Sequence, residues 1–453
     1  MGTVKSLLLG MCFVLGACTS QTSTVQTTEK GTQWEWQNGT IVVKTPERPA
    51  GQKSVLGLTT PKLEAVRVGF VGLGMRGPGA VERFTYIPGT QVVALCDYEE
   101  ARADKCQELL KKASMPKAAV YSGDKGYEEL CKRDDIDLVY IAADWLHHFP
   151  VAKCALENGK NVAIEVPSAM NLQECWDLIN LSESTRKHCF ILENCGDVYA
   201  THGLGPVAQA LDIHRGDRME TLVAMDTKSV VGKELVEKRT GEECKEFRNG
   251  DHTTTMIRTA NGKVIEIQHN VMTPQPYNRL YQLTGTKGFA NKYPVEGYAL
   301  DADQLSASGV QPKVDDLNSH GFLPETEMEA LVEKYQHPIL KKYGEMAKEV
   351  GGHGGMDFVM DSRLVYCLQN GLPLDMDVYD LAEWCCLAEL GELSMDNGCA
   401  AVAFPDFTRG EWNVVKGYKH AYATPEEEAA AMEKAKAFTA KLKEQGAKEW
   451  AEK

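Results

Sequence analysis

The sequence predicts an α/β protein with an N-terminal doubly wound parallel sheet, followed by an α+β domain with a large, mostly antiparallel sheet. Between residues 66 and 192, short apolar runs alternate with helical segments, which is the pattern of a parallel sheet covered by crossover helices. A glycine-rich turn follows the first of these runs. Beyond about residue 200 the strands become longer and alternate between apolar and polar residues, which is typical of antiparallel sheets.

The first apolar run, residues 66–71, is expected to be a buried strand that ends in the G-x-G-x-x-G turn of residues 72–77. Gly72 permits the tight turn, Gly74 lets the backbone approach a pyrophosphate, and Gly77 lets the next helix pack against the strand. Residues 79–86 are the predicted helix, whose N-terminal N–H groups and dipole favour a phosphate. The turn therefore indicates a Rossmann-type dinucleotide site.

A second strand, residues 91–96, ends on Asp97, twenty residues beyond Gly77. A carboxylate at this position accepts hydrogen bonds from a ribose diol and repels a 2′-phosphate, so NAD is favoured over NADP. Arg76 is the one feature that points the other way. The alternative is a purely structural glycine turn, and the strand, helix and Asp97 around the motif argue against it.

Three further strands are predicted at residues 137–143, 161–165 and 188–192. The helices between them are expected at residues 99–113, 126–132, 151–158 and 172–185, with residues 144–150 as a loop. Ligands of doubly wound sheets bind at the C-terminal ends of the strands. Besides the glycine turn and Asp97, those ends carry Trp145, Leu146, His147, His148, Glu165, Val166, Glu193 and Asn194.

The second domain is expected to cover the cofactor with an antiparallel sheet. Its strands are predicted at residues 221–230, 253–258, 264–270 and 280–284, with an Asn261-Gly262 turn between the second and third. Helices are predicted at residues 327–335, 356–370 and 379–393. Residues 425–453 are rich in Ala, Glu and Lys and predict a solvated surface helix. The expected domains are residues 64–195, 196–424 and this last helix.

The first residues predict an export signal rather than part of the fold. Lys5 is followed by a short apolar stretch and then by Leu-Gly-Ala-Cys, which resembles the bacterial lipobox. Residues 1–17 are then a lipoprotein signal peptide, and Cys18 is the lipidated mature N-terminus. Residues 18–63 are a tether and N-terminal extension, flexible over residues 19–32. We expect a lipid-anchored protein of the bacterial cell envelope, periplasmic or outer-membrane; an ordinary signal peptide is the alternative.

The composition excludes some classes of protein and site. The net charge of −15 and the pI near 5.3 argue against a nucleic-acid partner. Fourteen cysteines are scattered without a C-x-x-C pair or a Cys/His cluster of ligand spacing, so no metal site is predicted. Those at apolar positions are expected to be free buried thiols, namely Cys96, Cys106, Cys154, Cys175 and Cys189.

Taken in order, several short motifs resemble one enzyme family. They are G-L-G-M-R-G, W-L-H-H-F-P, E-V-P, L-E-N-C, Y-A-T-H-G and G-G-M-D-F, between about residues 66 and 412. This order resembles the glucose–fructose oxidoreductase and inositol dehydrogenase superfamily and, within it, glycoside hydrolase family 109. Members of that family are NAD-dependent α-N-acetylgalactosaminidases, so the implied partner is a glycan with a terminal α-N-acetylgalactosamine. In the superfamily a sheet face often forms a dimer, so a homodimer is also open.

The resemblance implies a redox route to hydrolysis. NAD⁺ takes hydride from the sugar C3, the C2 proton becomes acidic, the glycosidic oxygen is eliminated, water adds, and the hydride returns. Ordinary sugar dehydrogenases of this fold have Glu-Lys-Pro, with the lysine as acid or base. Val166 stands at that lysine position here. Glu-Val-Pro is the pattern of the glycosidases.

Residue roles follow from the resemblance by position. Contact with NAD is implied for the glycine turn with Met75 and Arg76, for Asp97, for Trp145 to His148, and for Glu165, Val166 and Asn194. The Tyr-x-Thr-His motif is Tyr199, Ala200, Thr201 and His202, in which the tyrosine lies between cofactor and sugar and the histidine is an acid/base. Tyr277 matches a sugar-contacting tyrosine.

Structural alternatives exist for several of these residues. His202 could be a capping or hydrogen-bonded histidine, and one of His147 and His148 is expected only to orient backbone. Tyr277, between prolines, could be a packed loop tyrosine. His353, inside Gly-Gly-His-Gly-Gly, either reaches the pocket or reflects loop plasticity.

One departure from the family affects the substrate site. A long stretch normally separates the Glu-Asn-Cys strand end from Tyr-x-Thr-His, but only three residues lie between Cys195 and Tyr199. The substrate residues of that stretch are therefore missing. Three functions remain open: an NAD-dependent α-N-acetylgalactosaminidase, a sugar or inositol dehydrogenase, and a catalytically impaired remnant that binds NAD or glycan.

Overall fold

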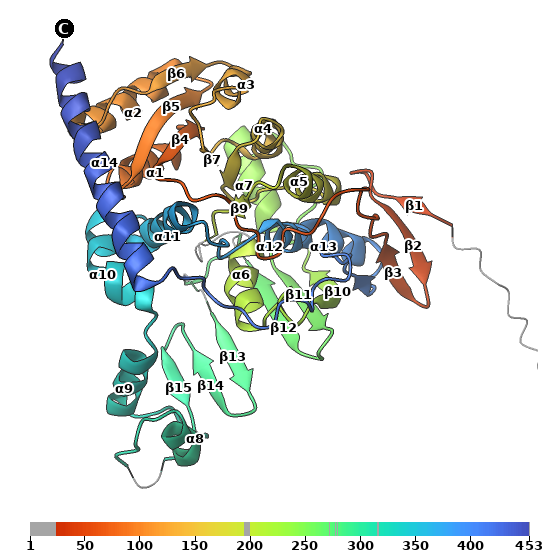
Figure 1. Ribbon diagram of the computed structural model, residues 1–453. Coiled ribbons are helices and arrows are strands. Elements are labelled where there is room, and N and C mark those ends of the chain that lie inside the picture. The colour runs from red at the N-terminus through yellow and green to blue at the C-terminus, as the bar shows by residue number, and fades with distance from the viewer. Residues whose placement is uncertain are drawn as a thin grey trace, which may run out of the picture.

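A computed structural model describes residues 24–193, 200–270, 272–276, 278, 280–314 and 317–452 of the 453-residue chain. Helix α6 spans Ala200–Ala210, but side chains are described only from His202 onward. Figure 1 shows the first domain beside the C-terminal helix, a second sheet next to it, and a smaller unit that projects from the body.

The first domain is built on a six-stranded parallel sheet in the order β6-β5-β4-β7-β8-β9. This is the doubly wound order that the apolar runs predict, and it is confirmed. Helices cover both faces, so the strands are mostly apolar and buried, except that the edge strand β6 is partly exposed. The strands are β4 (Val66–Val71), β5 (Thr90–Asp97), β6 (Ala119–Ser122), β7 (Leu138–Ile141), β8 (Asn161–Ile164) and β9 (Cys189–Ile191).

Five helices connect these strands: α1 (Gly77–Phe84), α2 (Glu100–Lys112), α3 (Gly126–Cys131), α4 (Trp145–Glu157) and α5 (Leu172–Thr185). The loop predicted over residues 144–150 is wrong, because α4 begins at Trp145. The Asp144 side chain caps the helix by accepting from the Leu146 N–H, and Pro150 is tolerated inside it. The helix therefore begins at Trp145, six residues before the predicted start at residue 151.

The second domain contains a seven-stranded sheet in the order β1-β2-β3-β16-β10-β11-β12. All its pairings are antiparallel except that of β16 with β3. Its strands are β1 (Gln26–Thr27), β2 (Gln33–Gln37), β3 (Thr40–Val43), β10 (Met219–Asp226), β11 (Thr253–Thr259), β12 (Val264–His269) and β16 (Val402–Ala403).

The N-terminal extension is part of this sheet, which the sequence reading did not predict. Asn38 and Gly39, with φ of 50° and 81°, form the turn between β2 and β3. Strand β1 lies within the stretch that was predicted to be a flexible tether. The hairpin of β2 and β3 is therefore held by β16, where Val402 pairs with Ile41 across 361 positions (402 − 41) of the chain.

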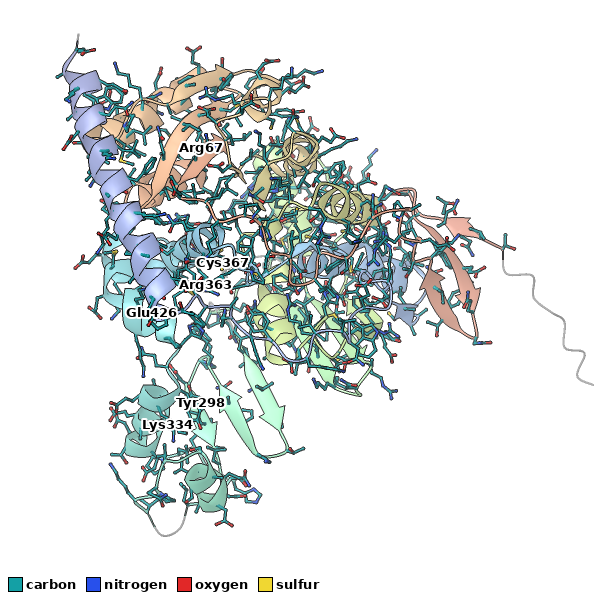
Figure 2. All side chains as sticks on the ribbon, in the orientation of Figure 1. Arg67, Tyr298, Lys334, Arg363, Cys367 and Glu426 are labelled. Atoms are coloured by element: carbon teal, nitrogen blue, oxygen red, sulfur yellow. The ribbon has the colours of Figure 1, made fainter. Side chains whose placement is uncertain are left out.

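A smaller unit projects from the body (Figure 1). Its three-stranded sheet consists of β13 (Gln282–Gly285), β14 (Gly288–Asn291) and β15 (Gly297–Ala299), next to α8 (Ala302–Ala307) and α9 (Glu325–Tyr335). It has its own small core of Leu305, Leu323 and Leu331. Tyr298 and Lys334 mark it in Figure 2. The strand predicted at residues 280–284 belongs to this sheet, not to the large one.

The remaining helices are α7 (Val231–Thr240), α10 (Pro338–Val350), α11 (Met356–Asn370), α12 (Val378–Cys385) and α13 (Leu387–Asp396), and a 3₁₀ turn, η1 (His353–Gly355), precedes α11. The single helix predicted over residues 379–393 is interrupted at Cys386, whose Sγ donates to the Glu383 carbonyl. In the described part of the chain the cysteines are free thiols, and no helix there has the length and apolarity to cross a membrane.

A buried carboxylate connects the two domains. Glu183, on α5, is only 1% exposed and accepts from Arg48 of the N-terminal extension, at 3.2 Å. It also accepts from Arg409 at 2.9 Å and from the hydroxyl of Tyr379 at 2.6 Å. The Glu183 carboxylate of the first domain thus binds residues of both the extension and the second domain.

The C-terminal helix α14 (Pro425–Ala451) is not fully solvated, contrary to the prediction. One face packs on the first domain through buried Ala435, Leu442 and Gly446. The Trp450 Nε1–H donates to the Met115 carbonyl at 2.7 Å. Few apolar residues are needed for this contact, because Gly446 lets the helix pack against the backbone of Ser114 and Met115. Figure 1 shows α14 running along the first domain.

Gly446→Ala tests this packing. A Cβ at this position would lie 2.3 Å from the Ser114 carbonyl oxygen. Glycine to alanine inside a helix ordinarily stabilises by about 0.5–1 kcal/mol. Here we expect the opposite sign, a loss of about 1–3 kcal/mol in the free energy of unfolding, measured by urea denaturation. Exposed Lys448→Ala is the control, and a stabilised Gly446→Ala variant would contradict the contact.

Candidate functional site

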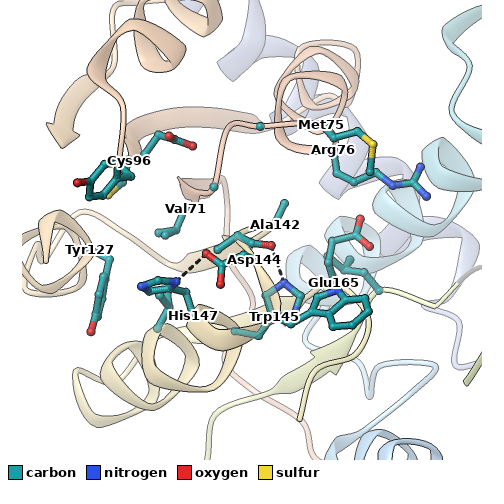
Figure 3. Close-up of a pocket in the computed structure, with 18 of the residues that line it drawn as sticks. Val71, Met75, Arg76, Cys96, Tyr127, Ala142, Asp144, Trp145, His147 and Glu165 are labelled. Atoms are coloured by element: carbon teal, nitrogen blue, oxygen red, sulfur yellow. Dashed lines mark hydrogen bonds and ion pairs between the residues drawn. The ribbon is translucent and has the colours of Figure 1, made fainter. Parts of the chain in front are cut away.

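A cavity of about 440 Å³ lies at the C-terminal edge of the parallel sheet. The second domain closes it with His202 of α6, His353 of η1 and Asp357 of α11. Figure 3 shows Arg76 and Glu165 at one end and Tyr127 at the other, with Asp144 and His147 between them. From the predicted site, the lining includes Gly72, Gly74, Met75, Arg76, Asp97, Trp145, His147, His148, Glu165, Val166 and His202.

The glycine turn fits the anionic part of a dinucleotide. Gly72 has φ +90°, and a Cβ there would lie 2.3 Å from the backbone nitrogen of Ala143. A Cβ on Gly77 would lie 2.1 Å from the Gly72 carbonyl oxygen, so Gly77 serves helix packing and does not line the cavity. Gly74 is exposed to the cavity and has no backbone near its Cβ position. It leaves the open backbone that a pyrophosphate needs.

Asp97 ends β5 at the cavity wall, as predicted, and it also holds the glycine turn. The Leu73 N–H donates to its Oδ2 at 2.6 Å, and the Glu99 N–H donates to its Oδ1 at 2.9 Å. Arg102 lies 3.4 Å from the same Oδ1. A carboxylate oxygen has two lone pairs, so these contacts leave acceptor capacity for a ribose diol.

The start of α4 lines the cavity floor. Trp145 and His147 face it, and the His147 Nδ1 lies 2.7 Å from Asp144 Oδ2. His148 is buried, with its two ring nitrogens 2.7 Å from the Pro167 carbonyl oxygen and 3.0 Å from that of Ala143. Burial lowers the pKa of His148. It is thus the histidine that orients backbone. Leu146 is 78% exposed and lies outside the cavity lining.

Glu165 follows β8 at the end of the cavity that Arg76 occupies (Figure 3). Desolvation raises the pKa of its carboxyl group to about 7, while the positive charge of Arg76 opposes the rise. Val166 lines the cavity beside it. Valine has no ionisable group, so no amine stands at this position.

His202 reaches the cavity from α6. Its Nδ1 lies 2.5 Å from Glu193 Oε2, and both side chains are buried. The Tyr281 hydroxyl donates to the His202 carbonyl and helps to fix this turn of the helix. With the Nδ1 proton donated to Glu193, Nε2 carries the lone pair of the ring. The arrangement is that of an oriented general base.

His353 is a cavity residue that the sequence left open between a pocket role and loop plasticity. It lies 3.1 Å from Arg76 and 2.9 Å from Asp357. Several other lining residues were not proposed, and those with polar side chains include Tyr98, Arg102, Asp124 and Tyr127. The sequence offered a signal for Tyr98, since it directly follows the predicted cofactor residue Asp97.

Several predicted site residues fall outside the described part of the chain. These are Asn194, Tyr199, Tyr277 and Cys18, together with the side chains of Ala200 and Thr201. Among the residues the structure describes, no group of three or more His, Cys, Asp or Glu side chains could hold a metal ion.

The fold and the cavity together define a two-domain protein that binds a dinucleotide. An NAD-binding Rossmann fold of the oxidoreductase family matches residues 66–192, and the C-terminal domain of glycosyl hydrolase 109 matches residues 137–414. The chain belongs to glycosyl hydrolase family 109. It is a glycoside hydrolase with an oxidoreductase fold, and NAD is its cofactor.

Curated relatives agree over almost the full chain. The chain is 77% identical to glycosyl hydrolase family 109 protein 5 of Phocaeicola vulgatus, covering all of this chain and 98% of that protein. It is 54% identical to protein 1 of the same family from Bacteroides thetaiotaomicron, over 93% of this chain and all of that one. The alignment with the first runs over 512 positions, so it contains gaps opposite residues that this chain lacks.

Two solved structures share the fold. A levoglucosan dehydrogenase in complex with NADH and L-sorbose has a TM-score of 0.53 at 14% identity, covering 76% of this chain and all of that one. An NAD-binding oxidoreductase from Klebsiella pneumoniae has a TM-score of 0.52 at 14% identity, covering 75% and 99%. At this identity the likeness establishes the architecture only.

Glu165→Gln tests the electrostatics of the cavity. Because the folded-state pKa is raised from 4.5 to about 7, the folded protein binds a proton that the unfolded chain releases. Stability of the cofactor-free protein should therefore fall as pH rises from 4.5 through 7. In Glu165→Gln, this pH-dependent loss of unfolding free energy should be smaller by up to about 3 kcal/mol. That figure is an upper limit, because water in the cavity screens the charge. Urea melts at pH 4.5 and 8 measure it; equal pH dependence in both proteins would contradict it.

Proposed function

We propose that this enzyme releases terminal α-N-acetylgalactosamine from glycans, with His202 as the acid/base that acts on the sugar. The substrate class is the one that the motif order implies. The observation that carries the proposal is the His202–Glu193 pair, at 2.5 Å, in the same cavity as the glycine turn. An oriented base beside a dinucleotide pocket is what a redox-assisted glycosidase needs.

Bound NAD⁺ would supply reversible hydride acceptance at the sugar C3. The remaining steps are proton transfers, which side chains of the protein carry out. Glu193 fixes the ring tautomer of His202, so that Nε2 accepts the C2 proton, the C2–C1 double bond forms, and the glycosidic oxygen leaves. The same imidazolium returns the proton to C2 when water adds at C1: the hydroxyl of that water bonds to C1, and its remaining proton goes to the glycosidic oxygen that has left. Val166, without an amine, takes no part in these proton transfers.

Two other functions compete with this one. A sugar or inositol dehydrogenase would form NADH with free sugars, and Val166 at the position of the dehydrogenase lysine argues against it. A catalytically impaired remnant would bind NAD or glycan without turnover. Only three residues separate Cys195 from Tyr199, so the substrate residues that the family carries in this stretch are missing, and this favours the remnant.

Release of p-nitrophenol from p-nitrophenyl α-N-acetylgalactosaminide, with and without added NAD⁺, tests the proposal. His202→Ala should lower the rate by about 10²–10⁴-fold while NAD binding persists, because only the proton transfer is lost. Glu193→Gln should have an effect of similar direction, since a glutamine amide donates to Nδ1 and places the ring proton on Nε2. His320→Ala, an exposed histidine of the projecting unit, is the matched control.

Each outcome separates the three functions. NAD-dependent release that His202→Ala abolishes supports the glycosidase. Net NADH formation with free sugars would identify a dehydrogenase. No release, combined with an NAD-induced rise in melting temperature, would identify the remnant and overturn the proposal.

We also propose that the mature protein is anchored in the cell envelope by a lipid on Cys18, and that it forms a homodimer. Cys18 ends the lipobox-like Leu-Gly-Ala-Cys. Cells fed a palmitate analogue should label the protein, and Cys18→Ala should lose the label. An unlabelled wild-type protein would refute the anchor. Light scattering at the monomer mass would refute the dimer.

A further inference from the structure

An unusual backbone segment carries His353 into the cavity. Five successive residues have positive φ: Gly351, Gly352, His353, Gly354 and Gly355, at 87°, 82°, 44°, 68° and 101°. Positive φ costs glycine little but is strained for histidine. A non-glycine residue is kept in such a conformation only when its surroundings fix it, and functional sites are where this strain concentrates.

The neighbouring glycines are required by close packing. A Cβ on Gly352 would lie 2.6 Å from the Cβ of Asp357, and a Cβ on Gly355 would lie 2.5 Å from the Ala347 carbonyl oxygen. The loop is therefore pressed onto the end of α10 and the start of α11. This packing holds His353 in place in the cavity, which favours the pocket role over loop plasticity.

His353 is the middle member of a chain of polar contacts. Its Nε2 lies 3.1 Å from Arg76 Nη1, and its Nδ1 lies 2.9 Å from Asp357 Oδ1. An arginine can only donate, so His353 accepts at Nε2 and holds its own proton on Nδ1, directed at Asp357. Asp357 in turn lies 3.5 Å from Arg83, which is bound to Asp361 at 2.7 Å. The Arg76 guanidinium is thus oriented through residues of the second domain.

We propose that His353 is a positioning residue for the cofactor: it fixes Arg76 so that the other guanidinium N–H groups serve the NAD pyrophosphate. Arg76 directly precedes Gly77 at the start of α1, beside the open backbone of Gly74. A guanidinium has five N–H donors in a fixed fork, and one bond to His353 sets the direction of the rest. A long exposed arginine would otherwise lose side-chain entropy on binding.

The role couples cofactor binding to the second domain. The glycine turn belongs to the first domain, whereas His353 belongs to a loop about 280 residues later. The affinity of Arg76 for the pyrophosphate therefore depends on the docking of the two domains. This suits a cofactor that stays bound through each cycle. The inference concerns NAD binding alone and does not depend on the proposed glycosidase reaction.

Calorimetric titration of the cofactor-depleted full chain tests the inference, with NAD⁺, ADP-ribose and adenosine as probes. His353→Ala should weaken NAD⁺ and ADP-ribose about tenfold and leave adenosine unchanged, because adenosine lacks the pyrophosphate. His353→Gln should restore binding, since its amide oxygen can accept from Arg76. The double variant His353→Ala/Arg76→Ala should bind no more weakly than Arg76→Ala alone. His320→Ala is the control.

Three results would overturn the inference. Unchanged NAD⁺ affinity in His353→Ala would mean that Arg76 needs no positioning. Additive losses in the double variant would mean that His353 does not act through Arg76. Equal weakening of all three probes, with a lowered melting temperature, would mean that the loop only supports the fold.

Discussion

The relation between the two domains depends on the buried carboxylate of Glu183. It lies on a helix of the nucleotide-binding domain and accepts from Arg48, Arg409 and Tyr379, which come from three other parts of the chain. Removing one partner from a buried ion pair typically costs about 3–5 kcal/mol, because a charge is left without compensation. A cavity made by both domains keeps its shape only while these segments meet.

Two histidines of the second domain, His202 and His353, line this cavity, and each is paired with a carboxylate. The His202 ring, paired with Glu193, lines the cavity, and in the proposed mechanism its outer nitrogen accepts the C2 proton of the sugar. In the His353–Asp357 pair the outer nitrogen already accepts from Arg76. In the two roles proposed above, the same chemical pair supplies a proton acceptor in one place and fixes the Arg76 cation in the other.

The sequence was most informative where local pattern and tertiary role coincide. The parallel strands, the glycine turn and Asp97 were predictable because each has a signature of spacing or apolarity. The N-terminal hairpin carried an Asn38-Gly39 turn signal, but its pairing with β16 depends on a contact with Val402, far away in the sequence. His353 could not be placed either, because a glycine-rich loop does not reveal which neighbour it packs on. Helix α14 was predicted to be solvated because it has few apolar residues, whereas three buried positions, Ala435, Leu442 and Gly446, are enough to pack it on the first domain.

The docking of α14 also sets an order of events during synthesis. The nucleotide-binding domain leaves the ribosome before the helix that covers Gly89, Ser114 and Met115, because the whole second domain lies between them in the chain. Until α14 has emerged, the first domain exposes the surface that buried Ala435 and Leu442 later cover. The first domain therefore stays incompletely packed while the second domain is being made.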